Sequence, residues 1–263
     1  MKNYLSPTTA AIITTYKCTA ACQECCFECS PRVSNNQISY NEMKLFIDQI
    51  QKYNSIKILV WSGGECFLIR HNLLKGISYA KAKGIPSRCV TNGYWAKNFE
   101  QATKILTEFK QAGLSEINFS TGDSHQKFIP VERILYGVIS ALKLGLIVAV
   151  SVETTKNNTF LKENFVNHPL YKKYIKETIY EKNLVVSSSI WVSFHSDTKY
   201  EYEEKLVNEK NGCSSIFDTI ALEPTHGLVG CCGLTIGDIK ELHLGKLKKN
   251  TDLQKIFNQQ YLD

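Results

Sequence analysis

The feature that most constrains the fold of this 263-residue chain is a regular alternation of short apolar runs and amphipathic segments. Residues with the pattern of β-strands occupy 10–15, 56–61, 85–91, 116–120, 146–152 and 184–194. Segments with helical spacing separate them, at 39–50, 72–83, 99–112, 131–144 and 160–182. Strict alternation predicts an α/β fold with parallel strands and crossover helices. Because six units fall two short of a closed eightfold barrel, we predict a partial (β/α)6 barrel.

The alternation stops near residue 195. A polar connector follows, then a short region rich in Cys and Gly, and a last helical segment near 253–260. We therefore predict two domains, residues 1–195 as the partial barrel and 196–263 as a small C-terminal extension. In parallel sheets of this kind ligands bind at the carboxyl ends of the strands, so candidate residues are sought in the loops that follow them.

Composition narrows the class of protein. The chain is 43% hydrophobic and 21% charged, as globular proteins are. It has no apolar run of membrane-spanning length and no signal-peptide pattern, so we expect a cytoplasmic protein without a membrane partner. The net charge of +6 is scattered and no base-stacking motif accompanies it, so we expect no nucleic-acid partner. In a reducing cytosol ten cysteines favour metal or redox chemistry over disulfides.

Five of those cysteines lie within residues 18–29. Cys18, Cys22 and Cys25 have the spacing C-x3-C-x2-C and follow the first predicted strand. Three thiolates on one loop can hold a [4Fe–4S] cluster and leave one iron without a protein ligand. Zinc is the alternative, with Cys29 as the fourth ligand. The spacing of the cysteines favours an iron–sulfur cluster over a zinc site.

These motifs resemble those of the radical S-adenosylmethionine (SAM) superfamily, which has a partial, TIM-like (β/α)6 barrel. The resemblance covers about residues 8–155 and rests on four motifs in order. C-x3-C-x2-C is followed by SGGE at 62–65, TNG at 91–93 and NFSTGDSHQKFIP from residue 118. Each follows or closes a predicted strand.

The resemblance implies a catalytic [4Fe–4S] cluster on Cys18, Cys22 and Cys25 that binds SAM and, once reduced, cleaves it to a 5′-deoxyadenosyl radical. An electron donor such as flavodoxin or ferredoxin is then expected. It also implies that the GGE segment binds the amino group of SAM, with cofactor contacts from other strand ends. The cofactor-binding residues expected are Ser62, Gly63, Gly64, Glu65, Thr91, Asn92, Ser120 and Glu153.

Two positions depart from the family pattern. Glu24 precedes the third cysteine, where an aromatic residue is common, and Cys66 replaces the proline that usually follows GGE. The second departure predicts a thiol close to the cofactor. Cys66 is therefore the candidate catalytic residue, as a hydrogen-atom donor, with core packing as the alternative.

A second group of cysteines lies in the extension: Cys213, Cys231 and Cys232. Their spacing resembles the first half of the SPASM and twitch extensions, which bind auxiliary [4Fe–4S] clusters, while the later cysteines of a full SPASM domain are absent. We predict one auxiliary cluster, with Cys29 or Cys26 as a possible fourth ligand. The alternatives are a site left open for substrate and three buried apolar cysteines.

These features lead to three functional hypotheses. The first is a radical SAM enzyme that modifies a peptide by a thioether or carbon–carbon cross-link or by epimerisation. Since the cysteine motif begins at residue 18, we expect peptide recognition by the barrel surface or by a separate leader-peptide recognition protein. The second is an epimerase or dehydrogenase of a sugar, aminoglycoside or other small metabolite. The third is a non-catalytic iron–sulfur or zinc scaffold.

Overall fold

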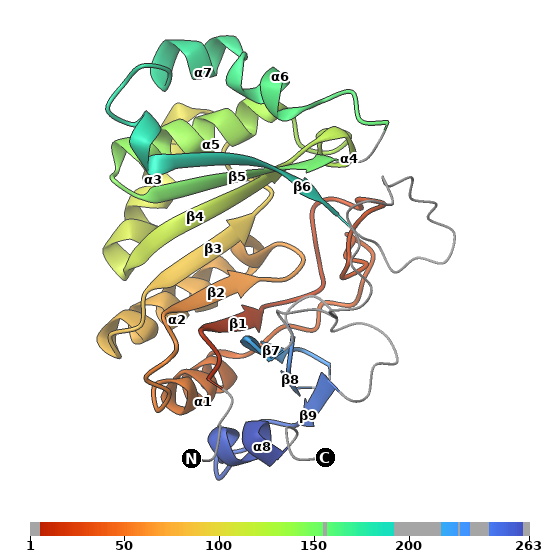
Figure 1. The fold of residues 1–263 in the computed structure, drawn as a ribbon, viewed down its shortest axis with the longest axis vertical. Coiled ribbons are helices and arrows are strands. Elements are labelled where there is room, and N and C mark those ends of the chain that lie inside the picture. The colour runs from red at the N-terminus through yellow and green to blue at the C-terminus, as the bar shows by residue number, and fades with distance from the viewer. Residues whose placement is uncertain (1–5, 155–156, 192–216, 226, 232–241, 260–263) are drawn as a thin grey trace.

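The fold is described from a computed structural model, which covers residues 6–154, 157–191, 217–225, 227–231 and 242–259. Its described strands form one sheet of nine, in the order β6-β5-β4-β3-β2-β1-β7-β8-β9 (Figure 1). The strands are β1 (Thr9–Ile13), β2 (Ile58–Ser62), β3 (Ser87–Thr91), β4 (Leu114–Thr121), β5 (Ile147–Thr154), β6 (Leu184–Ile190), β7 (Thr219–Glu223), β8 (Gly227–Val229) and β9 (His243–Gly245).

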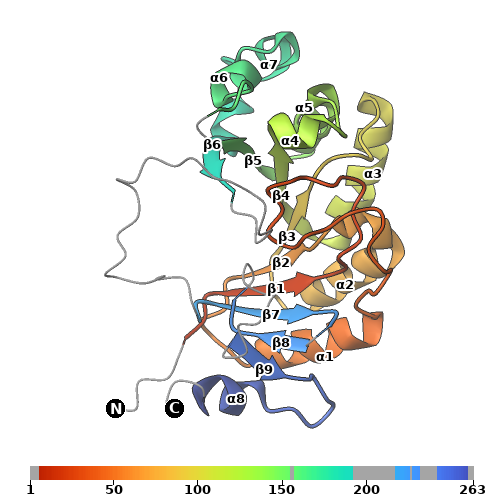
Figure 2. The same ribbon diagram turned by 90° about the vertical axis from the view of Figure 1, so that its right-hand side faces the viewer.

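Strands β1 to β6 pair in parallel in chain order, as strict alternation predicts. Figure 2 shows α1, α2, α3 and α5 along one side of this sheet. The helices are α1 (Tyr40–Ile50), α2 (Arg70–Ala82), α3 (Phe99–Ala112), α4 (Asp123–Gln126), α5 (Val131–Lys143), α6 (Lys162–Val166), α7 (Pro169–Tyr174) and α8 (Leu253–Gln259), with 3₁₀ turns at Cys66–Ile69 and Glu181–Asn183. The sheet is open, so the predicted partial barrel is confirmed.

The apolar faces of α1, α2, α3 and α5 pack on the strands in one continuous core. Met43, Phe46, Ile47 and Ile50 of α1 are fully buried, at the helical spacing seen in the sequence. Ser39 and Glu42 form the predicted capping box, which fixes where α1 begins. The cysteine motif therefore lies in the loop between β1 and α1.

The prediction of one helical segment over 160–182 is wrong. The structure has two short helices there, α6 and α7, followed by a 3₁₀ turn. The Nδ1 atom of His168 accepts a hydrogen bond from the Leu170 N–H, and Pro169 occupies the first position of α7. Because proline has no N–H to donate, it starts a helix but does not continue one.

The C-terminal strands continue the sheet of the barrel. β7 pairs in parallel with β1, so that Ala10 lies beside Ile220, and β8 and β9 then pair antiparallel to their neighbours. The first strand of the chain thus lies between β2 and β7 (Figure 1). Within the described residues, no helix is both long and apolar enough to cross a lipid bilayer.

Candidate functional site

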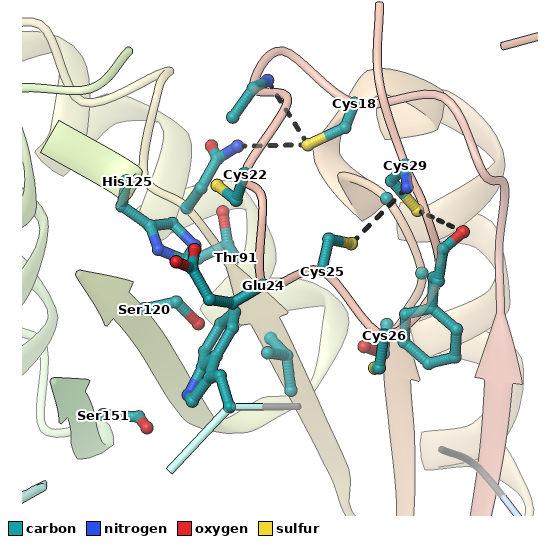
Figure 3. Close-up of a pocket in the computed structure, with 18 of the residues that line it drawn as sticks. Cys18, Cys22, Glu24, Cys25, Cys26, Cys29, Thr91, Ser120, His125 and Ser151 are labelled. Atoms are coloured by element: carbon teal, nitrogen blue, oxygen red, sulfur yellow. Dashed lines mark hydrogen bonds between the residues drawn. The ribbon is translucent and has the colours of Figure 1, made fainter. Parts of the chain in front are cut away.

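A cavity of about 530 Å³ lies at the carboxyl ends of the parallel strands (Figure 3). The loop of residues 14–39, here called the cysteine loop, forms one wall. Five of its thiols line the cavity: Cys18, Cys22, Cys25, Cys26 and Cys29. Of the residues predicted to bind cofactor, those that line it are Ser62, Gly63, Gly64, Thr91, Asn92 and Ser120. The structure thus brings most of the sequence-predicted site into one space.

The glycine pair after β2 lets two loops touch backbone to backbone. The Gly64 N–H donates to the Thr15 carbonyl at 2.7 Å, and the Glu65 N–H donates to the Lys17 carbonyl at 3.0 Å. A Cβ atom on Gly64 would lie 2.2 Å from the Lys17 oxygen, and one on Gly63, whose φ is +123°, would lie 2.4 Å from the Thr15 oxygen. Glycine is required at both positions because any side chain would push the cysteine loop away.

Asn92, which follows β3, holds the loop at its first thiol. Its Nδ2 donates to the Cys18 Sγ at 3.4 Å and to the Thr19 Oγ1 at 3.0 Å. The Ala20 N–H also donates to the Cys18 Sγ, and the Cys29 N–H donates to the Cys25 Sγ, both at 3.4 Å. Such N–H groups stabilise thiolates, the form of cysteine that binds metals.

Glu65 organises the loops below the cavity and does not itself line it. Its carboxylate accepts hydrogen bonds from the Thr91 hydroxyl, the Asn92 N–H and the Phe67 N–H, at 2.8–3.0 Å. It is fully buried, and this desolvation raises its pKa to about 7. The contact of its carboxylate with the SAM amino group therefore remains a prediction.

Burial also shifts the pKa values of the thiols in the cysteine loop. It raises the pKa of Cys18 to about 12 and raises that of Cys22 well above the usual range. The pKa of Cys25 is instead lowered to about 6, chiefly by hydrogen bonding from Cys29. The same contact and burial raise the pKa of Cys29. A bound cation would favour the thiolate form of the buried thiols.

The chemistry of this wall fits an iron–sulfur cluster. Cys18, Cys22 and Cys25 face one cavity, and N–H donors reach the sulfurs of the first and third. Among the side chains that the structure describes, no group of three Cys, His, Asp or Glu is arranged to hold a single metal ion. Cys18, Cys22 and Cys25 are the residues that would hold a cluster here.

The structure does not bring Cys66 to the cavity. Its side chain is fully buried in the core, and its Sγ donates to the Val90 carbonyl at 3.3 Å. Burial, the neighbouring thiol of Cys89 and nearby Glu65 raise its pKa well above the ordinary value. Cys66 is therefore a core-packing residue, the alternative considered for it from the sequence. Cys89 is likewise buried, within β3.

The candidate ligands of a second cluster are only partly visible. Cys29 stays within the cysteine loop, with its Sγ 3.7 Å from the Phe27 carbonyl. Cys231 is partly exposed just after β8. Cys213 and Cys232 lie outside the described residues, so the predicted auxiliary cluster remains a prediction.

Sequence reasoning gave Glu153 a direct cofactor role, but its side chain does not line the cavity. It is 3% exposed, and its Oε2 lies 2.7 Å from the Nδ1 of His125, which does line it. Ser151, Ile190 and Trp191 also line the cavity. No spacing in the sequence singles out these residues; their position after or near the end of a predicted strand was the available signal.

A second buried carboxylate holds the other side of the cysteine loop. Glu223, at the end of β7, accepts a hydrogen bond of 2.7 Å from the Tyr16 hydroxyl. The Tyr16 ring also contacts Phe27 within the loop, with centroids 6.3 Å apart. Sequence reasoning missed this pair, because 207 positions separate its members.

No protein-family model matches the chain. One curated protein that it matches is YydG of Bacillus subtilis, named as a peptide biosynthesis protein, at 22% identity over 113 residues. The match spans 43% of this chain and only 35% of YydG, about a third of that protein's length.

Solved structures match over nearly the whole chain. The anSMEcpe enzyme with bound AdoMet matches at a TM-score of 0.64 and 14% identity, covering 97% of this chain and 82% of that one. The same enzyme with AdoMet and the Cp18Cys peptide gives 0.61 and 13% over the same shares. BtrN in an open conformation gives 0.51 and 11%, over 100% of this chain and 84% of its own.

These neighbours are radical SAM enzymes. The likeness confirms the fold that the resemblance of the cysteine, SGGE and strand-end motifs implied. The chain has the fold of the radical SAM enzymes, with the motif cysteines at the mouth of its open barrel.

Proposed function

We propose that this chain is a radical SAM enzyme whose substrate is a peptide. The observation that carries the proposal is the wall formed by Cys18, Cys22 and Cys25, which lines one cavity together with Gly63 and Gly64. A reduced [4Fe–4S] cluster held there would supply the one electron needed to cleave SAM to methionine and a 5′-deoxyadenosyl radical, the species that would remove hydrogen from the substrate.

The chain's own residues would bind the cluster and shape the cavity for the cofactor. Cys18, Cys22 and Cys25 hold the cluster, and Asn92 donates to the sulfur of Cys18. The backbone after β2 fixes the cysteine loop and lines the cofactor cavity through Gly63 and Gly64. The cavity walls include the apolar side chains of Phe119, Ile190 and Trp191, and a radical reaction requires such shielding from water.

Two similarities support a peptide as the substrate. YydG is named as a peptide biosynthesis protein, and one solved structure of similar fold holds a peptide beside AdoMet. Modification of the peptide by cross-linking or epimerisation is the reaction class we propose. The electron donor is a flavodoxin or ferredoxin, and a separate leader-peptide recognition protein delivers the substrate.

Anaerobic reconstitution tests the first part of the proposal. Purified protein is loaded with iron and sulfide, reduced with dithionite in the presence of SAM, and assayed for 5′-deoxyadenosine. We expect about four irons per chain at the first site and SAM cleavage. Replacing Cys18, Cys22 and Cys25 by Ala should abolish both, whereas Cys89→Ala, a control in the core, should keep both. Metal without SAM cleavage would leave only the scaffold function.

The iron count also tests the auxiliary cluster. We propose that Cys213, Cys231 and Cys232 supply ligands to a second [4Fe–4S] cluster, which predicts about eight irons per chain. Cys231→Ala should then lower the count by about four and leave the first site loaded. A count of about four in the unmodified protein would exclude the second cluster.

The substrate class needs a separate test. The enzyme is incubated in D2O with the products of short open reading frames near its gene, and the peptides are examined by mass spectrometry. Loss of two hydrogens indicates a cross-link, whereas gain of one deuterium at unchanged composition indicates epimerisation. Turnover of a sugar or aminoglycoside, with no peptide modified, would favour the small-metabolite alternative.

A further inference from the structure

A histidine and a glutamate form a buried pair on the side of the cavity that β4 and β5 build. The His125 Nδ1 lies 2.7 Å from the Glu153 Oε2, and the two side chains are 7% and 3% exposed. His125 comes from α4, which follows β4, and Glu153 comes from β5. Buried imidazole–carboxylate pairs of this geometry fix both the tautomer and the orientation of the ring.

The surrounding structure is built to accommodate Glu153. A Cβ atom on Gly122 would lie 2.1 Å from the Glu153 Cγ, so only glycine allows the carboxylate to pass beneath α4. The Ser124 N–H donates to the Glu153 Oε1, and the Ser124 hydroxyl donates to the carboxylate of Glu24 on the cysteine loop. Glu153 therefore ties α4 to β5, and Ser124 ties α4 to the cysteine loop.

This arrangement decides which nitrogen of His125 is available. One Glu153 oxygen accepts from the Ser124 N–H and the other faces Nδ1, so a hydrogen on Nδ1 satisfies this contact. In the neutral ring Nε2 is then an acceptor. Among the described residues the structure gives Nε2 no hydrogen-bond partner, and the ring lines the cavity. Figure 3 shows the ring beside Cys22 and Glu24, above Ser120.

The Trp191 indole holds the ring from another side. Its centroid lies 4.8 Å from that of His125, and the planes cross at 88°. Edge-to-face contact of this kind restricts rotation of both rings. The imidazole is thus held by Glu153 and Trp191, with one acceptor nitrogen left for a bound molecule.

We propose that His125 binds the molecule held in the cavity, its Nε2 accepting a hydrogen bond from an N–H or O–H group, and that Glu153 is the positioning residue for the ring. The inference deepens the proposed function and rests on it for the identity of the ligand. The donor belongs either to SAM, through its amino or hydroxyl groups, or to the substrate, through an amide or hydroxyl.

Diethyl pyrocarbonate tests the accessible nitrogen, because it acylates unprotonated imidazole nitrogen. Anaerobically reconstituted protein is treated and mapped by mass spectrometry, with exposed His71 as the internal reference. We expect His125 to react despite its burial. If His71 reacts and His125 does not, the proposal is overturned, whether or not the protein cleaves SAM.

Adding SAM separates the two donors. SAM binding is first measured by equilibrium dialysis, and the treatment is then repeated at ten times the Kd. Slowing of the His125 reaction by about tenfold assigns the donor to SAM, by mass action. An unchanged rate with SAM bound assigns it to the substrate. Both outcomes support an Nε2 that faces bound molecules.

Glu153→Gln tests the positioning role, with Glu223→Gln as the matched control. Both carboxylates are buried at strand ends, so both variants lose stability. Only Glu153→Gln should slow the His125 reaction, because Glu153 and not Glu223 contacts the imidazole and holds Nε2 toward the cavity. Equal rates in the two variants would show that Glu153 only stabilises the fold.

Discussion

The cysteine loop is held in different ways on its β2 side and on its β7 side. Toward β2 and β3 it is held by backbone hydrogen bonds to Gly64 and Glu65, at contacts too close for any side chain. Toward β7 it is held by the hydroxyl of Tyr16, bonded to buried Glu223. The first side depends chiefly on the absence of side chains, with one hydrogen bond added by Asn92, and the second depends on one specific side-chain pair. Only the first leaves a recognisable sequence motif.

The comparison predicts its largest effect for Gly64→Ala. The new Cβ would lie 2.2 Å from the Lys17 carbonyl oxygen, and backbone cannot move aside as a side chain can. We expect a loss of about 3 kcal/mol or more in the free energy of unfolding and almost no iron bound by Cys18, Cys22 and Cys25 after reconstitution. Urea denaturation and iron assay measure both. Gly145→Ala is the control, since φ there is +71° but no atom lies within 4 Å of a new Cβ. If both variants bind iron equally, the close contact does not hold the loop.

A smaller effect is expected for Tyr16→Phe on the other side. The change removes a buried hydrogen bond of 2.7 Å to a carboxylate, worth about 1.5–3 kcal/mol. The loop should still bind iron but release it faster to a chelator such as EDTA, because its first residues are less firmly held. Iron release at the wild-type rate, with stability lowered, would show that the pair contributes to the fold alone.

Asn92→Ala tests the same side of the cysteine loop as Gly64→Ala, but it removes a side chain, whereas Gly64→Ala adds one. It deletes the N–H donor to the Cys18 sulfur and should cost about 1 kcal/mol. Loss of a hydrogen bond to a cluster ligand also makes the reduction potential more negative, because the reduced cluster carries more negative charge. Spectroelectrochemical titration measures this shift. A potential equal to that of the unmodified protein would mean that Asn92 only fixes the loop.

The smallest effect is expected for Thr8→Val, at the opposite end of the β1–β7 pair. The Thr8 hydroxyl donates to the Asp218 carboxylate at 3.0 Å, but this contact is exposed and far from the thiols. We expect about 0.5 kcal/mol or less and unchanged iron release. Thr8→Val is therefore the control for Tyr16→Phe, and faster iron release in it would mean that any weakening of the β1–β7 pair loosens the loop.

Periodicity was enough to predict most of the barrel. Helix α3 has the predicted bounds, and the six parallel strands follow in the predicted order. The segment over 160–182 failed because its charged residues kept a helical pattern across Pro169, where the chain starts a new helix. The pairing of β7 with β1 could not be predicted, because no local pattern encodes contacts between distant strands.

The site residues likewise fall into those that the sequence predicted and those that it did not. Cys18, Cys22, Cys25, Gly63 and Gly64 were predicted from short-range motifs, and the structure gathers them at one cavity. Cys66 was placed near the cofactor by its neighbours in sequence, but its side chain turns into the core. The sequence singled out Glu153, but its pairing with His125 and the pairing of Tyr16 with Glu223 are decided by the three-dimensional fold. Sequence motifs therefore located the reactive groups, while the structure was needed to find which side chains each supporting residue holds.

The span between Tyr16 and Glu223 has a consequence for how the protein is made. The bond that completes the support of the cysteine loop joins residues 207 positions apart, so it forms only after nearly all of this chain has left the ribosome. Contacts of such long range form late in folding, since the loop that they close is long. We therefore expect the cysteines to emerge first and to be the last part of the site to become ordered, which makes insertion of a cluster a step that follows synthesis.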